Sequence, residues 1–295
     1  MIDEEVLYRI TDLKSDKKFK CLNIGMSSTG LPESLTFLDN QFFIDEILNN
    51  DNIHAVITTA KLAKKINKKK LCILSEDPRY SFYQLYNHFS KQQDIKEITK
   101  IHEYAKLSTD CLISEHNVKI GFGTVIESGV IIKSGVHIGD NCLIRSGAVL
   151  GAEGFEYKRT SKGILSVHHG GKLILENKVE VGANSVIEKG FLNRDTYIAH
   201  STKIGTMVCI GHACYIDSNC LIASKSSIGG SCLIGKDCWV GINSTISNGI
   251  KIGTGANIAL GSVVTSNVNA GEAVAGNFAY KKSKFLKNYM RSKLL

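Results

Sequence analysis

The chain has 295 residues, of which 43% are apolar and 22% charged, and it carries a net charge of +8. This composition is that of a soluble globular protein and excludes a disordered chain. No stretch approaches the roughly 18 consecutive apolar residues of a membrane span, and the acidic start MIDEEVLYRI lacks a signal-peptide layout, so a cytoplasmic location is expected. The lysine-rich runs at residues 61–70 and 280–295 have no nucleic-acid-binding motif beside them. They indicate solvated faces or a phosphate-rich partner, and no nucleic acid.

Residues 1–100 have the pattern of a mixed α/β region. Apolar runs predict strands at residues 21–25, 53–59 and 70–75, and helical periodicity predicts helices over 41–50 and 80–92. The aromatic residues of the second helix recur at spacings of three and four, which predicts that they belong to the core: Phe82, Tyr83, Tyr86 and Phe89.

The remainder of the chain repeats every six residues. An aliphatic residue recurs at each sixth position and a small or β-branched residue stands two positions before it, in three blocks: Ile120 to Leu150, Leu175 to Ile187, and Ile198 to Val264. Alternation within a short strand sends both positions to the same face, which must be the interior. The glycine or small polar residue that follows suits a turn. Three such hexads close a triangular coil of 18 residues, and stacking of the coils buries the interior.

Five of the nine cysteines occupy the small interior position of this repeat: Cys142, Cys214, Cys220, Cys232 and Cys238. Disulfide or zinc sites would require paired spacings, whereas these cysteines follow the six-residue period. We therefore expect reduced, structural cysteines and no metal site.

The repeat resembles that of the hexapeptide acyltransferases, whose fold is the left-handed parallel β-helix. The handedness follows from the resemblance alone. The predicted architecture is mainly β: an α/β nucleotide-binding domain over residues 1–103, a left-handed parallel β-helix over 104–268 with a loop insertion at 152–171, and a tail with a short C-terminal helix over 269–295.

Several segments resemble, more narrowly, the UDP-3-O-acylglucosamine N-acyltransferases of lipid A synthesis. They are SLTFLDNQFF, HAVITTA and CILSEDPRYSFYQLYNHF in the N-terminal region, and GAEGFEY and VEVGANSVIEKGFL in the repeat. The resemblance implies that Phe37, Asn40 and Phe43 hold a nucleobase, with aromatic faces stacking on it and the amide reading its polar edge. Without the resemblance, the same residues would indicate a strand-to-helix junction with core phenylalanines.

The same resemblance implies a catalytic histidine after the GAN segment, and alignment of the repeat places it at His212. The segment YIAH around His200 matches the family's local motif more closely. His200 nevertheless lies 12 residues before His212 and therefore on another face of the prism. A histidine can take the proton of an attacking amine because its pKa lies near neutrality. The resemblance further implies that the backbone amide of Gly230, one coil after His212, stabilises the oxyanion.

The chain departs from this family at three positions and in its tail. Gly205 and Thr206 replace an Asp-Asn pair, and Gly249 replaces a histidine. The ending VAGNFA is similar to that of coenzyme A-dependent relatives. These differences favour an N-acyltransferase that moves an acyl group from acyl-CoA to the amine of a nucleotide-linked amino sugar for surface polysaccharide synthesis, such as a dTDP-4-amino-4,6-dideoxyhexose. We expect a homotrimer with no permanently bound cofactor.

Three alternatives remain open. The first is the lipid A enzyme itself, a UDP-3-O-acylglucosamine N-acyltransferase that uses acyl carrier protein. The second is a non-catalytic β-helix that binds a nucleotide. The third is a metal-dependent hydratase of the carbonic anhydrase kind, built on His200, His212 and a third histidine.

Overall fold

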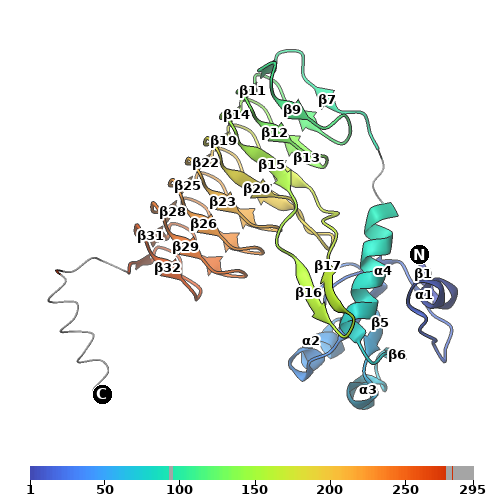
Figure 1. Cartoon of the computed structure of the whole chain (residues 1–295). Coiled ribbons are helices and arrows are strands. Elements are labelled where there is room, and N and C mark those ends of the chain that lie inside the picture. Colours follow the sequence, from blue (N-terminus) through green and yellow to red (C-terminus); the bar gives the residue numbers. More distant parts are fainter. Residues whose placement is uncertain (93–95, 277–280, 282–295) are drawn as a thin grey trace.

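The computed structural model describes residues 1–92, 96–276 and 281. It consists of a small α/β part at the N-terminus and a long parallel β-helix, and a hairpin extends from the β-helix alongside the N-terminal part (Figure 1). The expected C-terminal helix lies outside the described residues. No helix in the described ranges is long and apolar enough to cross a membrane.

The N-terminal part is built on a four-stranded parallel sheet with the order β3-β4-β5-β6. These strands are β3 (Asn23–Ile24), β4 (Ser34–Leu38), β5 (Ile53–Thr58) and β6 (Leu71–Leu74). The helices are α1 (Glu4–Thr11), the 3₁₀ turn η1 (Gln41–Phe43), α2 (Ile44–Asn49), α3 (Ala60–Ile66) and α4 (Pro78–Gln92). A separate antiparallel pair joins β1 (Ile2–Asp3) to β2 (Lys20–Cys21).

The predicted elements of this part are largely confirmed. The strands at 53–59 and 70–75 and the helices at 41–50 and 80–92 are present, and Phe82, Tyr83 and Tyr86 are buried. The run at 21–25 is divided between two sheets, because β2 pairs with β1 while β3 pairs with β4. Helix α3 lies in the lysine-rich run, where Leu62, Ala63 and Ile66 form a buried stripe beneath the lysines.

Three parallel sheets form the walls of the β-helix. Wall 1 contains β7 (Lys100–Ile101), β10 (Lys119–Ile120), β13 (Val136–Ile138), β18 (Leu173–Leu175), β21 (Thr196–Ile198), β24 (Tyr215–Ile216), β27 (Leu233–Ile234) and β30 (Lys251–Ile252). Wall 2 contains β8 (Lys106–Leu107), β11 (Val125–Ile126), β14 (Leu143–Ile144), β19 (Glu180–Val181), β22 (Lys203–Ile204), β25 (Leu221–Ile222), β28 (Trp239–Val240), β31 (Asn257–Ile258) and β33 (Ala273–Val274). Wall 3 contains β9 (Leu112–Ile113), β12 (Ile131–Ile132), β15 (Val149–Ala152), β20 (Val186–Glu188), β23 (Cys209–Ile210), β26 (Ser227–Ile228), β29 (Thr245–Ile246) and β32 (Val263–Val264).

The six-residue repeat and the 18-residue coil are confirmed. Ile210 pairs with Ile228, and Ile228 pairs with Ile246, each one coil further along wall 3. The repeated aliphatic residues form one continuous buried core, and the five cysteines of the small interior position are buried and reduced. The thiol of Cys214 donates to the carbonyl of Gly229, so the small position also satisfies a backbone acceptor near a corner. The stack begins one coil earlier than the clear repeat, at β7.

The chain leaves the prism twice, at residues 152–172 and 188–195, and both times between wall 3 and wall 1. We call this edge corner 3–1. The first excursion forms the antiparallel hairpin of β16 (Tyr157–Thr160) and β17 (Gly163–Ser166), which lies beside α4 (Figure 1). The Asn87 side chain on α4 donates to the carbonyl of Ser166 (2.8 Å) and accepts from the N–H of His168 (2.8 Å). This contact joins the N-terminal part to the β-helix.

Candidate active site

His212 lies at corner 3–1 between β23 and β24, and its side chain is only 13% exposed. Its backbone N–H donates to Oε2 of Glu188 (2.8 Å), and its Nδ1 lies 3.2 Å from the same oxygen. On the other side of the ring, Nε2 lies 3.4 Å from Oε2 of Glu156. The imidazole is therefore held between two carboxylates.

The two carboxylates determine the charge of this histidine. Burial alone would lower the pKa of His212, but its contacts with Glu156 and Glu188 outweigh burial and raise the pKa to about 9. Burial would likewise raise the pKa of Glu156, but His212 and Lys158 keep it below its usual value. At neutral pH the free protein thus carries an imidazolium between two carboxylates.

Glu156 connects His212 to the hairpin and to the N-terminal part. Its carboxylate also pairs with Lys158, two residues further along the hairpin. The Lys158 ammonium lies 5.2 Å from the ring centre of Tyr83, which stands on α4. Alternate residues of an extended strand share a face, so Glu156 and Lys158 point the same way. A row of contacts therefore runs from α4 to the imidazole.

Gly230 lies beside the imidazole of His212, one coil further along corner 3–1. A Cβ added at Gly230 would lie 2.5 Å from Nε2 of His212, so only glycine leaves room for the ring at this distance. The next amide along, that of Ser231, donates to the carbonyl of His212 (2.7 Å) and fixes the two coils in register. Within the described residues the Gly230 N–H donates to no acceptor. The structure thus brings together the two residues expected from the sequence at this point.

Phe37 and Phe43 line a cavity of about 240 Å³ with Asp39, Arg79 and Lys158. The Phe37 ring packs on Phe82, with ring centres 4.8 Å apart, whereas Phe43 is 46% exposed. The guanidinium of Arg79 is held by Asp39 at 2.8 Å. Two cations therefore stand at the wall of an aromatic pocket, and one of them belongs to the row of contacts that leads to His212.

Asn40 does not line this cavity. Its side-chain oxygen caps the 3₁₀ turn η1 by accepting from the N–H of Phe42 (3.1 Å), and the residue is exposed. The side-chain oxygen of the residue that the resemblance assigns to base reading therefore takes part in local structure.

The sequence reasoning missed the carboxylates that hold His212. Because Gly205 and Thr206 replace the Asp-Asn pair, the place where the resemblance puts an orienting carboxylate holds none, and the sequence left open what orients His212. Glu188 takes this place from the preceding coil, since Ile187 pairs with Ile210 across wall 3. Ile187 keeps the six-residue repeat, so the position of its neighbour Glu188 one coil before His212 could have been inferred from the sequence. Glu156 gave no comparable signal, because it precedes a hairpin outside the repeat.

Two further rings enclose the imidazole. The ring centres of Phe191 and His169 lie 5.0 Å and 5.6 Å from that of His212. Both residues come from the excursions at corner 3–1, and both are buried. The excursions therefore cover the site as well as supplying Glu156 and Glu188.

His200 occupies a different corner, between β21 of wall 1 and β22 of wall 2. It pairs with Glu176 through the same two contacts that His212 makes with Glu188, but its side chain is 58% exposed. The hydratase alternative required His200 and His212 in one metal site, and the structure separates them. The described residues include no cluster of three or more His, Cys, Asp or Glu side chains that could hold a metal ion.

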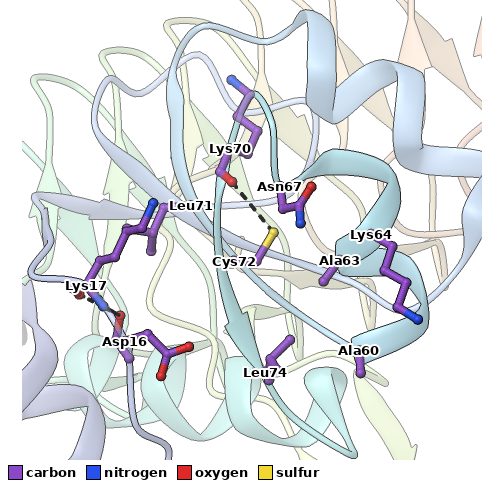
Figure 2. Close-up of a pocket in the computed structure, with 11 residues that line it drawn as sticks. Asp16, Lys17, Ala60, Ala63, Lys64, Asn67, Lys70, Leu71, Cys72 and Leu74 are labelled. Atoms are coloured by element: carbon purple, nitrogen blue, oxygen red, sulfur yellow. Dashed lines mark hydrogen bonds between the residues drawn. The ribbon is translucent and has the colours of Figure 1, made fainter.

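A further cavity, of about 430 Å³, is lined by none of these residues (Figure 2). It is lined by the loop around Lys17, by α3 and by β6, and it contains none of the site residues expected from the sequence. The Cys72 thiol within it donates to the carbonyl of Lys70 (Figure 2). Its lining includes none of the residues that surround His212.

Comparisons with known proteins agree with this architecture. Residues 117–152 match the family model described as bacterial transferase hexapeptide (six repeats), and residues 232–266 match the hexapeptide repeat of succinyl-transferase. A solved UDP-N-acetylglucosamine acyltransferase from Francisella novicida has a TM-score of 0.50 and 21% identity, over 65% of this chain and 72% of that one. This likeness concerns the fold and confirms the left-handed parallel β-helix.

Two curated relatives are UDP-3-O-acylglucosamine N-acyltransferases. The enzyme from Fusobacterium nucleatum is 31% identical over 248 residues, which cover 73% of this chain and 73% of the relative. The enzyme from Paracidovorax citrulli is 26% identical over 198 residues, which cover 63% of this chain and 59% of the relative. The chain thus spans about three fifths of the length of one of these relatives and about three quarters of the other.

These relatives correct the functional hypothesis drawn from the sequence. An acyl-CoA-dependent enzyme acting on a dTDP-4-amino-4,6-dideoxyhexose for surface polysaccharide synthesis is wrong, because the matched relatives carry the name of the lipid A alternative. The loss of the Asp-Asn pair at 205 and 206 was a weak guide, because Glu188 and Glu156 supply carboxylates from elsewhere in the fold. The chain belongs to the UDP-3-O-acylglucosamine N-acyltransferase family.

Proposed function

We propose that the protein transfers an acyl group from the thioester of an acyl carrier protein to the amine of UDP-3-O-acylglucosamine. The observation that carries this proposal is the row of contacts from the aromatic pocket through Lys158 and Glu156 to His212 and Gly230. It offers one acceptor a place for a nucleobase at one end and for a reacting amine at the other.

The acceptor would enter with its uracil in the cavity of Phe37 and Phe43. Aromatic side chains stack on a base, and Arg79 and Lys158 at the cavity wall provide charge for the diphosphate. The sugar would then follow the hairpin toward corner 3–1, where Glu156 and His212 face each other. In this arrangement Glu156 is the carboxylate next to the acceptor amine.

The chemistry assigned to the site forms one bond and breaks another. The amine nitrogen attacks the thioester carbonyl carbon, and the developing oxyanion accepts the N–H of Gly230. Nε2 of His212 takes the proton that the nitrogen loses. Collapse of the tetrahedral intermediate breaks the carbon–sulfur bond, and the imidazolium returns the proton to the departing thiolate. The products are the amide and the free thiol, and the histidine ends as it began.

The general base must be neutral, yet the free protein holds His212 charged. We infer that binding of the acceptor gives the two carboxylates different roles. Glu188 keeps Nδ1 and the ring orientation, whereas Glu156 turns to the incoming amine and leaves Nε2 free. Loss of one carboxylate lowers the proton affinity of the ring, which can then act as a base.

We also propose a homotrimer in the cytoplasm. The outer face of wall 1 carries a row of large apolar side chains, in which the Tyr197 and Tyr215 rings stack with centres 5.2 Å apart and Leu233 is 44% exposed. Such a row on a β-helix wall suits contact with a second copy. Light scattering of the purified protein should give the mass of three chains, and a monomer mass at micromolar concentration would contradict the trimer.

The decisive assay combines the purified protein, UDP-3-O-acylglucosamine and an acyl carrier protein charged with an acyl group, and follows product mass and thiol release. His212→Ala should reduce turnover roughly 100-fold or more, because the general base is lost. His200→Ala is the matched control and should stay near wild type, and acyl-CoA should replace the charged carrier protein poorly. No turnover by the wild type would favour the non-catalytic alternative, and a dead His200→Ala beside an active His212→Ala would refute the assignment.

A further inference from the structure

A second cavity, of about 230 Å³, lies at corner 3–1 of the first coils. Consecutive coils line this cavity with four basic side chains, those of Lys119, His137, Lys172 and Lys189. Glu97 adds one carboxylate. Among the described residues of its wall there is no aliphatic side chain, and the only rings are those of two histidines. This lining suits neither an acyl chain nor a nucleobase.

The positive charges around this cavity are largely uncompensated. Lys119 and His137 are neighbours across the ladder of wall 1, and Lys172 directly precedes the next strand of the wall. Burial and the charges of Lys119 and Lys172 together lower the pKa of His137, although Asp195 and Glu97 oppose them. Lys189 lies 4.0 Å from Glu153, whereas no carboxylate of the described chain lies within that distance of the ammonium of Lys119 or Lys172.

His169, which also lines the cavity, carries an unpaired donor. Its Nε2 accepts from the N–H of Gly154 (3.1 Å), so the proton of the neutral ring stands on Nδ1. Burial and the nearby charge of His212 lower the pKa of His169, which keeps the ring neutral. The residue is 1% exposed, and Nδ1 has no partner in the described structure. A buried donor without an acceptor is costly and marks a place for a ligand oxygen.

We propose that this cavity binds the oxyanion of a phosphoryl group, at a site separate from the aromatic pocket of Phe37 and Phe43. Lys119 and Lys172 supply the charge, Ser134 offers a hydroxyl and His169 offers Nδ1–H. The diphosphate of the acceptor is placed elsewhere, because it joins a base in the aromatic pocket to a sugar at His212, and this cavity lies beyond His169. The anion therefore comes either from free phosphate or from the phosphodiester of a pantetheine arm. The proposal extends beyond the acyl-transfer function and does not depend on it.

The test is a titration of inorganic phosphate followed by the NMR signals of the histidine rings, at constant ionic strength. The His137 signal, assigned with a His137→Gln variant, should shift saturably at millimolar phosphate, and the pKa of His137 should rise. The variant K119Q/K172Q should bind phosphate at least about tenfold more weakly, since each lysine contributes a charged hydrogen bond. The variant K106Q/K251Q removes the same charge from exposed strand positions outside the cavity and should bind like wild type.

Competition distinguishes the sources of the anion. Displacement of phosphate by 4′-phosphopantetheine would assign the site to the donor arm, and its failure would leave free phosphate as the ligand. Displacement of phosphate by UDP would show that this cavity is part of the nucleotide site and would overturn the proposal of a separate site. An absent or non-saturable shift, or equal affinities in the two double variants, would overturn it as well.

Discussion

Glu188 binds His212 at two points although 24 positions separate them, because one carboxylate oxygen meets both the backbone N–H and the ring Nδ1. Glu188→Gln removes the charge and keeps the shape, so the ring should lose orientation and basicity. We expect turnover to fall by about 10- to 100-fold, as for other residues that orient a catalytic histidine. Glu176→Gln is the matched control, since Glu176 has the same relation to His200. Equal losses in the two variants would show that the effect is structural.

The pH dependence of kcat/KM should reflect the raised pKa of His212. The free protein holds the ring protonated below about pH 9, so the base form and the activity should increase as the pH rises toward that value. Glu156→Gln removes one of the two carboxylates that keep the ring charged, so the pKa of His212 should fall and the rising limb should move to lower pH. The acceptor amine titrates alike in both proteins, so the difference between their profiles isolates the histidine.

The measurement is kcat/KM from pH ~6 to ~10 for both proteins, with the His212 ring pKa followed by NMR. A limb that stays in place, or that moves to higher pH, would contradict the role given to Glu156.

Gly230→Ala tests the close approach of the ring. The added methyl would lie 2.5 Å from Nε2 of His212, so the imidazole must move away from the oxyanion donor. We expect kcat to fall on the order of 100-fold, comparable to the loss of one oxyanion-hole donor, with the thermal midpoint nearly unchanged. Gly276→Ala, where the methyl meets open space, should leave both values at wild type. Full activity of Gly230→Ala would remove this residue from the site.

The aromatic pocket can be tested with two adjacent phenylalanines. Phe43 lines the pocket, whereas Phe42 is 84% exposed and does not. Phe43→Ala should weaken binding of UDP by about tenfold, since stacking contributes about 1–3 kcal/mol per base, while Phe42→Ala should have no effect. Calorimetric titration with UDP provides the measurement. Equal affinity of the two variants would place the nucleotide elsewhere.

The β-helix was almost fully predictable, because its information is local and repeated. Each repeated aliphatic residue, such as Ile210 or Ile228, marks the position of one strand in the sequence. Together these residues fix the register that places Gly230 beside His212. The N-terminal part was less predictable where many lysines hide the apolar periodicity of a helix. Leu62 and Ile66 of α3 form a buried stripe within a lysine-rich run, and the stripe is shorter than the charge pattern around it.

The candidate site was predictable only as far as the repeat reached. The resemblance together with the period led to His212, whereas Glu156 depends on where a hairpin packs, and no periodic signal encodes that. Asn40 shows a second limit, because the side-chain oxygen of a residue assigned to a ligand by resemblance also caps a local turn. Polar residues of loops can serve either role, and only their neighbours decide between them.

Both excursions leave and rejoin the prism at one edge, so the ladders on all three walls continue across them: Leu150 pairs with Ile187, and Leu175 with Ile198. Chain can therefore be lengthened, shortened or exchanged at this edge without mispairing a coil. The scaffold can therefore accommodate variation at the edge that carries the proposed reacting groups, whereas a change of length within a coil would break the pairing. Related enzymes can accordingly differ in the substrate they accept by differing in sequence at corner 3–1, while the stack of coils stays the same.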